Sequence, residues 1–181
     1  LLKIRLKKAQ GQLVGGEKFF HFEDWHEEQR AIDELRTGLD IILKARQVGV
    51  STEELARDFW FALVHRGVNV LVLVQSKEVS YTLFAALQLF VKSLDEIGLL
   101  PTTQYSRRGE IVFETTGSSI RVTEAGETEK SASKKARSGT YHRLHCTEVA
   151  FWGAAASTMA AALESVPEGG EVVIESTPQG A

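Results

Sequence analysis

The stretch DIILKARQVGVST, residues 40–52, contains a short apolar run, a loop with a single glycine and the start of a helix. The apolar run predicts a buried strand at residues 40–43, and we expect the helix to open at Ser51. Such a strand–loop–helix unit can bind phosphate, because the first N–H groups of a helix lack internal partners and the helix dipole favours an anion there. The stretch therefore predicts an α/β fold and indicates a phosphate-binding loop.

Strand and helix patterns alternate on both sides of this loop. Six of the seven residues at 68–74, VNVLVLV, are apolar, which is typical of a strand buried on both faces of a parallel sheet. Asp24, with Glu27 three residues on, is expected to cap the first helix. The helices are expected at residues 24–38, 51–67, 77–94 and 154–164, and the strands at 40–43, 68–74, 110–114, 119–123, 143–147 and 171–175. This order predicts a mainly parallel sheet flanked by helices, with an inserted β-hairpin.

The composition narrows the class of protein. The 181 residues carry a net charge of −3, which argues against a surface that binds nucleic acid over its whole extent but allows a local basic patch. No apolar run is long enough to span a membrane, and a single cysteine, Cys146, excludes an intramolecular disulfide framework and favours a reducing compartment. We expect residues 1–22 to form an N-terminal arm or edge segment and residues 23–181 to form one domain, a fragment of a longer protein.

The predicted loop departs from the Walker A pattern G-x-x-x-x-G-K-[ST]. Ala45 stands at the first glycine and Val50 at the lysine, so an ordinary strand–turn–helix corner with Ser51 as N-cap remains an alternative. Lys44 and Arg46, however, supply positive charge from the other end of the loop. A hydroxyl at Ser51 or Thr52 could bind Mg²⁺.

Two further predicted strands end in polar residues. Strand 143–147 is followed by Glu148, where phosphate-loop ATPases carry an acidic pair that holds Mg²⁺ and polarises the attacking water. Only Glu148 of that pair is acidic here, because Thr147 stands at the first position. Ser176 and Thr177 follow the last strand, where hydroxyls could sense a γ-phosphate. Each of these ends has an ordinary alternative, a solvated cap for Glu148 and a polar turn for Ser176 and Thr177.

Four motifs in order identify a likeness to a known family. KARQVGVST at 44–52, VLVLVQSK at 70–77, HCTEVAFW at 145–152 and ESTPQG at 175–180 together resemble the ATPase domain of the tailed-phage terminase large subunit, the DNA-packaging motor. The resemblance covers roughly residues 20–181. It implies a P-loop NTPase fold of the ASCE, RecA-like type.

The resemblance also implies roles for individual residues. Glu148 matches the catalytic glutamate of the Walker B motif, Arg46 the loop arginine at the γ-phosphate, and Gln29 the glutamine that reads adenine. Ser51 and Thr147 are the implied Mg²⁺ ligands, although many members carry Asp at the position of Thr147, and its absence is expected to weaken Mg²⁺ binding and slow hydrolysis. The implied nucleotide-binding residues are Gln29, Lys44, Ala45, Arg46, Gln47, Val48, Gly49, Val50, Ser51 and Thr52, and the implied coupling motif is Ser176, Thr177 and Pro178.

The long polar segment 124–140 contains the basic residues Lys130, Lys134, Lys135 and Arg137. A basic loop of this kind is either simply solvated or functional, contacting the DNA backbone or reaching a neighbouring subunit's ATP. Within the resemblance, Arg137 is our candidate for a trans-acting catalytic arginine. The five histidines show no metal-ligand spacing, and Cys146 is expected in the core.

The function that the resemblance implies is Mg²⁺-dependent ATP hydrolysis that drives double-stranded viral DNA into a procapsid. The implied partners are double-stranded DNA, the terminase small subunit, the portal protein and further copies of the chain in a ring, with the isolated fragment a monomer. The implied location is the cytoplasm of the bacterial host, with no membrane. The family's nuclease domain lies C-terminal to the ATPase domain, so we expect no nuclease activity in this chain.

Two alternatives stay open on the sequence alone. A superfamily 2 helicase-like translocase would share the fold, but its usual Asp-Glu-x-His/Asp pattern is replaced by Thr147–Ala150. A degenerate module that binds nucleotide and assembles the motor without turnover is kept open by Val50 and Thr147.

Overall fold

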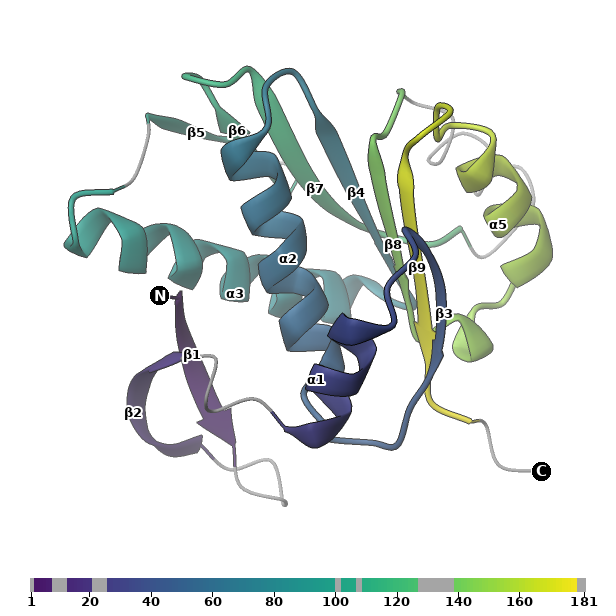
Figure 1. Ribbon diagram of the computed structural model, residues 1–181, viewed down its shortest axis with the longest axis horizontal. Coiled ribbons are helices and arrows are strands. Elements are labelled where there is room, and N and C mark those ends of the chain that lie inside the picture. Colours follow the sequence, from purple (N-terminus) through teal and green to yellow (C-terminus); the bar gives the residue numbers. More distant parts are fainter. Residues whose placement is uncertain are drawn as a thin grey trace.

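A computed structural model describes residues 2–7, 13–20, 26–99, 102–106, 109–126 and 139–178. Its main body is a seven-stranded sheet in the order β3-β9-β8-β4-β7-β6-β5 (Figure 1). The strands are β3 (Leu39–Leu43), β4 (Asn69–Val74), β5 (Thr103–Ser106), β6 (Glu110–Phe113), β7 (Ser118–Glu124), β8 (Arg143–Thr147) and β9 (Glu171–Ser176). The helices are α1 (Glu27–Glu34), α2 (Val50–Val64), α3 (Lys77–Glu96), the 3₁₀ turn η2 (Val149–Phe151) and α5 (Ala155–Leu163).

The sheet is mainly parallel, which confirms the predicted fold class. Strands β3, β9, β8, β4 and β7 run parallel, and β6 and β5 are added antiparallel beyond β7. The expected hairpin is β6–β7, in which Phe113 pairs with Ser118. Strand β5 was not predicted, because its sequence TQYS is short and lacks an apolar alternation.

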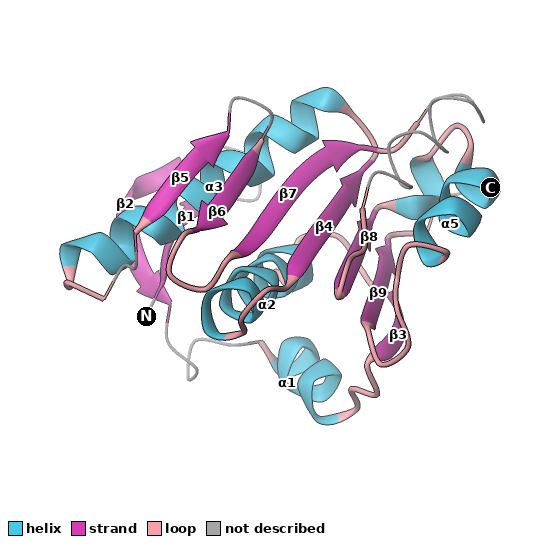
Figure 2. Ribbon diagram, turned by 90° about the horizontal axis from the view of Figure 1, so that it is seen from above, coloured by secondary structure: helices cyan, strands magenta, loops and turns pink. Residues whose placement is uncertain are grey.

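Strand β4 divides the core into two layers. Val70, Val72 and Val74 pack with residues of α2 and α3 on one face, and Leu71 and Leu73 pack with residues of β8 and α5 on the other. Figure 2 shows the helices α2 and α3 on one side of the sheet and α5 on the opposite side. Burial on both faces explains the continuous apolar run of this strand. Cys146 is fully buried in the second layer, as expected.

The prediction of a buried strand at 40–43 is wrong in one respect. β3 is the edge of the sheet, and Leu39, Ile41 and Leu43 are 71%, 82% and 74% exposed. The physical reason is that these alternate residues project from one face of the edge strand, and no described element covers that face there.

Two helix starts also differ from the prediction. α1 begins at Glu27 with His26 as N-cap rather than Asp24, which lies outside the described residues, because the polar side chain that reaches back is Gln29 and not Glu27. α2 begins at Val50 with Gly49 as N-cap, so Ser51 is the second helical residue and not the cap. Gly49 has φ +76°, a left-handed conformation that glycine adopts readily. The helix therefore begins at Val50, one residue before the predicted start at Ser51.

The N-terminal strands form a second, small sheet that contacts α3. β1 (Leu2–Lys7) and β2 (Leu13–Phe20) pair antiparallel in a two-stranded sheet of their own and do not join the central sheet. Within the described part of the chain, no helix has the length and apolar character needed to cross a membrane.

Candidate nucleotide-binding site

The predicted site residues meet at one edge of the sheet. Lys44 directly follows β3, Glu148 follows β8, and Thr177 follows β9, which lies between the other two strands. The carboxyl ends of parallel strands are where open α/β sheets bind ligands. The fold therefore brings together residues that are 104 and 29 positions apart in the chain.

Glu148 is held by contacts at both of its carboxylate oxygens. Oε1 lies 3.0 Å from Lys44 Nζ, and Oε2 accepts hydrogen bonds from the backbone N–H of Thr177 at 3.0 Å and from its hydroxyl at 2.8 Å. Partial burial alone favours the neutral acid, but the bonds from Thr177 and the ion pair with Lys44 outweigh it and lower the pKa of Glu148. Glu148 is therefore a carboxylate at neutral pH, the form that a general base requires.

The backbone of Glu148 is itself unusual. Its φ is +54°, in the left-handed region that a residue with a Cβ rarely adopts. Such residues persist where the surrounding structure fixes them, and they are concentrated at functional sites. Here the contacts of the side chain with Lys44 and Thr177 provide that fixation.

The loop between β3 and α2 is organised around the carbonyl of Gly49. That oxygen accepts hydrogen bonds from the N–H groups of Thr52 at 3.1 Å and Glu53 at 3.0 Å, and from Gln29 Nε2 at 3.1 Å. A Cβ placed on Gly49 would lie 2.9 Å from Gln29 Nε2. Gln47 also adopts a positive φ, of 65°. The loop is thus a compact turn that packs directly against α1.

Gln29 is fixed inside this turn and is only 2% exposed. Its Oε1 accepts the N–H of His26 at 2.8 Å while its Nε2 bonds Gly49. The structure therefore gives Gln29 a role in connecting α1 to the loop. The reading of adenine by Gln29 stays a prediction.

The other predicted residues lie around this edge. Ser176 contacts the segments that follow β3 and β8, because its carbonyl accepts the N–H of Lys44 at 3.1 Å and its hydroxyl accepts the N–H of Ala150 in η2 at 3.1 Å. Arg46 is exposed, whereas Thr147 is 3% exposed. Arg137 and the lysines at 130, 134 and 135 lie outside the described residues.

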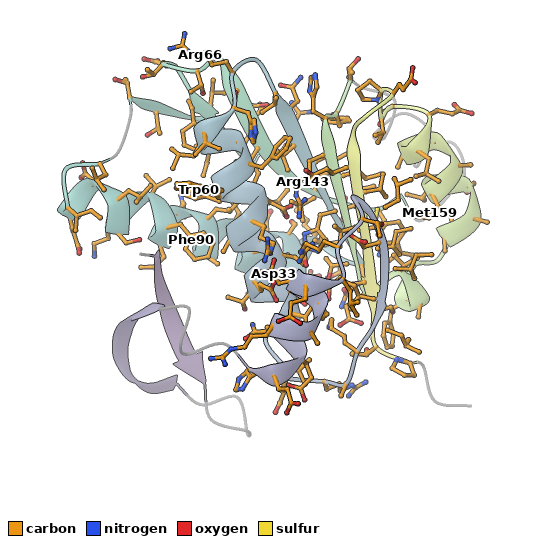
Figure 3. All side chains as sticks on the ribbon, viewed as in Figure 1. Asp33, Trp60, Arg66, Phe90, Arg143 and Met159 are labelled. Atoms are coloured by element: carbon orange, nitrogen blue, oxygen red, sulfur yellow. The ribbon has the colours of Figure 1, made fainter. Side chains whose placement is uncertain are left out.

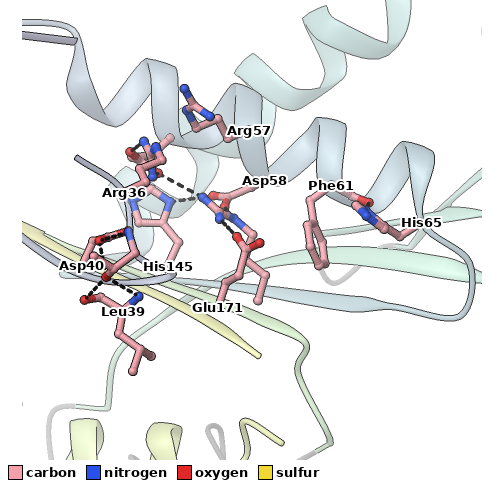
Figure 4. Close-up of polar contacts among 12 residues, drawn as sticks. Arg36, Leu39, Asp40, Arg57, Asp58, Phe61, His65, His145 and Glu171 are labelled. Carbon is pink, nitrogen blue, oxygen red and sulfur yellow. Dashed lines mark hydrogen bonds and ion pairs between the residues drawn. The ribbon is translucent and has the colours of Figure 1, made fainter. Parts of the chain in front are cut away.

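A buried ionic chain behind the site was not predicted from the sequence. Glu175 Oε2 lies 3.2 Å from Lys44 Nζ, and Glu175 Oε1 lies 3.5 Å from His145 Nε2. The other ring nitrogen, His145 Nδ1, lies 2.6 Å from Asp58 of α2 (Figure 4). The side chains of Glu175, His145 and Asp58 are fully buried. The sequence did contain a signal for it, because β8 has the polar residues Arg143, His145 and Thr147 at alternate positions.

The pKa values in this chain follow from the pairing. Burial disfavours the imidazolium, but the carboxylates of Asp58 and Glu175 outweigh it and raise the pKa of His145 to about 10. Burial likewise disfavours the carboxylate of Glu175, but the bond with His145 and the charge of Lys44 lower its pKa to about 2. At neutral pH the chain is therefore a row of alternating charges.

Arg143 extends the network to the opposite end of the strands. Its guanidinium lies 2.6 Å from Asp58 and 3.0 Å from Glu54, and it also pairs with Glu171. Figure 3 shows Arg143 near the middle of the molecule, beside α2. A cavity of about 420 Å³ opens there, lined by residues that include Arg36, Trp60 and Arg143 and by none of the loop residues 44–52.

The structure is an α/β fold with a mainly parallel sheet flanked by helices, and its candidate site lies at the carboxyl ends of β3, β9 and β8. No protein-family model matches the sequence, and no curated protein matches it. Solved structures do match. The ATPase domain of the large terminase of Thermus phage P74-26 aligns with a TM-score of 0.65 at 18% identity, covering 86% of this chain and 66% of that chain.

Two further solved structures agree. The large terminase of bacteriophage HK97 aligns with a TM-score of 0.63 at 12% identity, covering 90% of this chain and 34% of that chain. A large terminase from a thermophilic bacteriophage, in complex with ADP, aligns with a TM-score of 0.57 at 12% identity over 84% of this chain and 36% of that chain. The expected likeness to phage large terminase ATPase domains is thus confirmed at the level of the fold.

The oxygen-rich edge of the sheet fits Mg²⁺. No group of three or more His, Cys, Asp and Glu side chains that could hold a metal exists among the described residues. That is compatible with Mg²⁺, which takes few protein ligands and completes its shell with phosphate oxygens and water. The ammonium of Lys44 already lies between the carboxylates of Glu148 and Glu175. A cation is therefore accommodated at this point.

Proposed function

We propose that this chain is the ATPase part of a phage DNA-packaging terminase and hydrolyses ATP with Mg²⁺. The observation that carries the proposal is the ionised Glu148, held 3.0 Å from Lys44 at the carboxyl edge of β3, β9 and β8. A carboxylate base beside a lysine and a phosphate-type loop is the arrangement that in-line attack of water on a γ-phosphate requires. The shared fold with terminase ATPase domains supports the same function.

Each residue has a defined task in this proposal. The loop Lys44–Thr52 cradles the phosphates, with Lys44 moving from Glu148 to the phosphate oxygens and Arg46 stabilising charge on the γ-phosphate. Glu148, once released by Lys44, accepts a proton from the attacking water. Gln29 contacts adenine.

The metal and coupling residues complete the proposed site. When bound, Mg²⁺ neutralises charge on the phosphate oxygens, and the hydroxyls of Ser51 and Thr147, directly or through water, hold it. Ser176, Thr177 and Pro178 couple the reaction to motion, because Thr177 binds Glu148 while Ser176 binds both the loop and η2. A displacement of Glu148 therefore affects the loop that holds Lys44, the end of β9 and, through Ser176, η2.

The proposed biological setting follows that of terminases. The chain assembles with further copies in a ring, in which Arg137 of one copy reaches the ATP of the next. It acts on double-stranded DNA together with the small subunit and the portal protein in the host cytoplasm. Turnover by the isolated chain is slow, because the trans arginine is then missing.

One observation favours a second function, a module that binds nucleotide without hydrolysing it. Both oxygens of Glu148 are occupied, Oε1 by Lys44 and Oε2 by Thr177. If bound nucleotide did not draw Lys44 away, Glu148 would remain unable to accept a proton. The chain would then bind ATP and assemble without turnover.

The test compares steady-state ATP hydrolysis and ATP binding in the wild type, Glu148→Gln and Lys44→Ala, at several protein concentrations. We expect turnover to rise more steeply than protein concentration, to fall by about a hundredfold or more in Glu148→Gln, and to leave ATP binding intact in that variant. Lys44→Ala is expected to weaken binding itself. Binding without turnover in the wild type at every concentration would favour the second function, and no binding at all would contradict both.

A further inference from the structure

Glu175 lies on the strand between the predicted loop and Glu148. Its register partners are Ile42 on β3 and Thr147 on β8. Residues in register on neighbouring parallel strands project from the same face of a sheet. The carboxylate of Glu175 therefore projects from the same face as the side chain of Thr147, the position at which the acidic pair is incomplete.

The environment of Glu175 is built for a cation. Its side chain is fully buried, with Oε2 facing Lys44 and Oε1 facing His145. Lys44 Nζ lies 3.2 Å from Glu175 and 3.0 Å from Glu148, so a single positive charge is shared between two carboxylates. Two carboxylates that converge on one cation are also the oxygen ligands that a hard divalent cation prefers.

The position of Glu175 is fixed from behind. His145 lies 3.5 Å from Glu175 and is itself held by Asp58 at 2.6 Å, both on fully buried side chains. Partners of this kind orient a metal-facing carboxylate, and their loss typically weakens metal binding by about tenfold to a hundredfold. His145 and Asp58 are thus positioning residues, which act through Glu175.

We propose that Glu175 supplies from β9 the acidic group that Thr147 does not supply from β8, and that it faces the Mg²⁺ of the bound nucleotide. The ammonium of Lys44, which lies between Glu148 and Glu175, shows that a cation fits between these two carboxylates. With Lys44 turned to the phosphates of a bound nucleotide, Glu148 and Glu175 would be free to hold Mg²⁺, which would neutralise charge on the phosphate oxygens. The inference rests on the proposed ATPase function and names a metal-facing residue that the sequence motifs do not.

The test uses a variant in which the carboxylate is moved from position 175 on β9 to position 147 on β8. The measured quantity is the Mg²⁺ concentration that half-saturates binding of fluorescent N-methylanthraniloyl-ADP, for the wild type, Glu175→Gln and the double variant Thr147→Asp/Glu175→Gln. Glu175→Gln is expected to raise this concentration by about tenfold or more. The double variant, which restores one carboxylate on β8, is expected to return it to within about threefold of the wild type. If Glu175→Gln does not fold, Glu175→Asp, which keeps the charge but withdraws it by one methylene group, replaces it.

Glu54→Gln is the matched control. Glu54 is also fully buried and ion-paired, with Arg36 and Arg143 rather than with Lys44. Its neutralisation is expected to lower stability and leave the Mg²⁺ half-saturation within twofold of the wild type. If Glu175→Gln and Glu54→Gln shift it equally, or if Thr147→Asp does not rescue Glu175→Gln, the inference is wrong. If the wild type binds no labelled ADP at any Mg²⁺ concentration, the proposed ATPase function itself fails.

Discussion

Gly49 meets two independent requirements at the start of α2. Its φ of +76° is one that residues with a Cβ rarely adopt, and its Cβ position is occupied by the amide of Gln29 at 2.9 Å. A glycine in a loop before a helix could be predicted from the sequence, because the loop pattern includes it. The contact with Gln29 could not, because the two residues are 20 positions apart and no motif joins them.

Comparing alanine replacements of Gly49 and Gly117 separates the backbone requirement from the contact with Gln29. Gly49→Ala is expected to lose about 1–2 kcal/mol through the left-handed backbone and about 1 kcal/mol more through the bond with Gln29, and to weaken nucleotide binding because the loop must shift. Gly117→Ala is the control, since Gly117 has φ +68° with nothing within 4 Å of its Cβ position. Urea unfolding and ADP titration of both variants test this. Equal losses of stability and unchanged ADP binding would contradict the role of the Gln29 contact.

At the scale of elements, α2 and β8 are joined by charge as well as by apolar packing. Asp58 and Glu54 of α2 meet Arg143 and His145 of β8 in the interior. The periodicity of the sequence predicted both elements, because their apolar positions repeat at the helix and strand periods. It did not predict these pairs, because an ion pair between elements depends on the register of the helix on the sheet. The 87 positions between Asp58 and His145 match no motif that would predict their contact.

Because His145 is paired with Asp58 and Glu175, the stability of the protein is expected to fall as the pH rises above neutral. Its pKa is raised to about 10 from an ordinary value of 6.5, so its contribution to the free energy of unfolding is complete below pH 6.5 and is lost as the pH rises through about 10. His145→Gln has no such group. We expect the difference in the free energy of unfolding between wild type and His145→Gln, measured by urea titration, to shrink across this range. A difference that is constant with pH would show that His145 is not the buried imidazolium that the structure indicates.

For the whole molecule, the sequence predicted the fold class and the order of the main elements. Alternating strand and helix patterns determine such a topology because parallel strands need crossover helices. The position of β3 at the edge was not predictable from its own residues, since LDII and VLVLV are both apolar runs. Edge or centre is decided by the strand order, which the local sequence does not encode. The ion pairs of Glu175 with Lys44 and His145 were not predicted for the same reason, because these partners follow or belong to the two neighbouring strands.

Nucleotide binding at the carboxyl edge of β3, β9 and β8 can be tested by titration with ADP·Mg²⁺, followed through the amide chemical shifts of the assigned ¹⁵N spectrum. We predict shifts at residues 44–52, at Glu148 and at Thr177, with little change around the cavity beside Trp60 at the other end of the strands. The same titration of Lys44→Ala is expected to need more ADP. Shifts that cluster around Trp60 and Arg36, or a spectrum that does not respond to ADP, would show that nucleotide does not bind at the carboxyl edge of these strands.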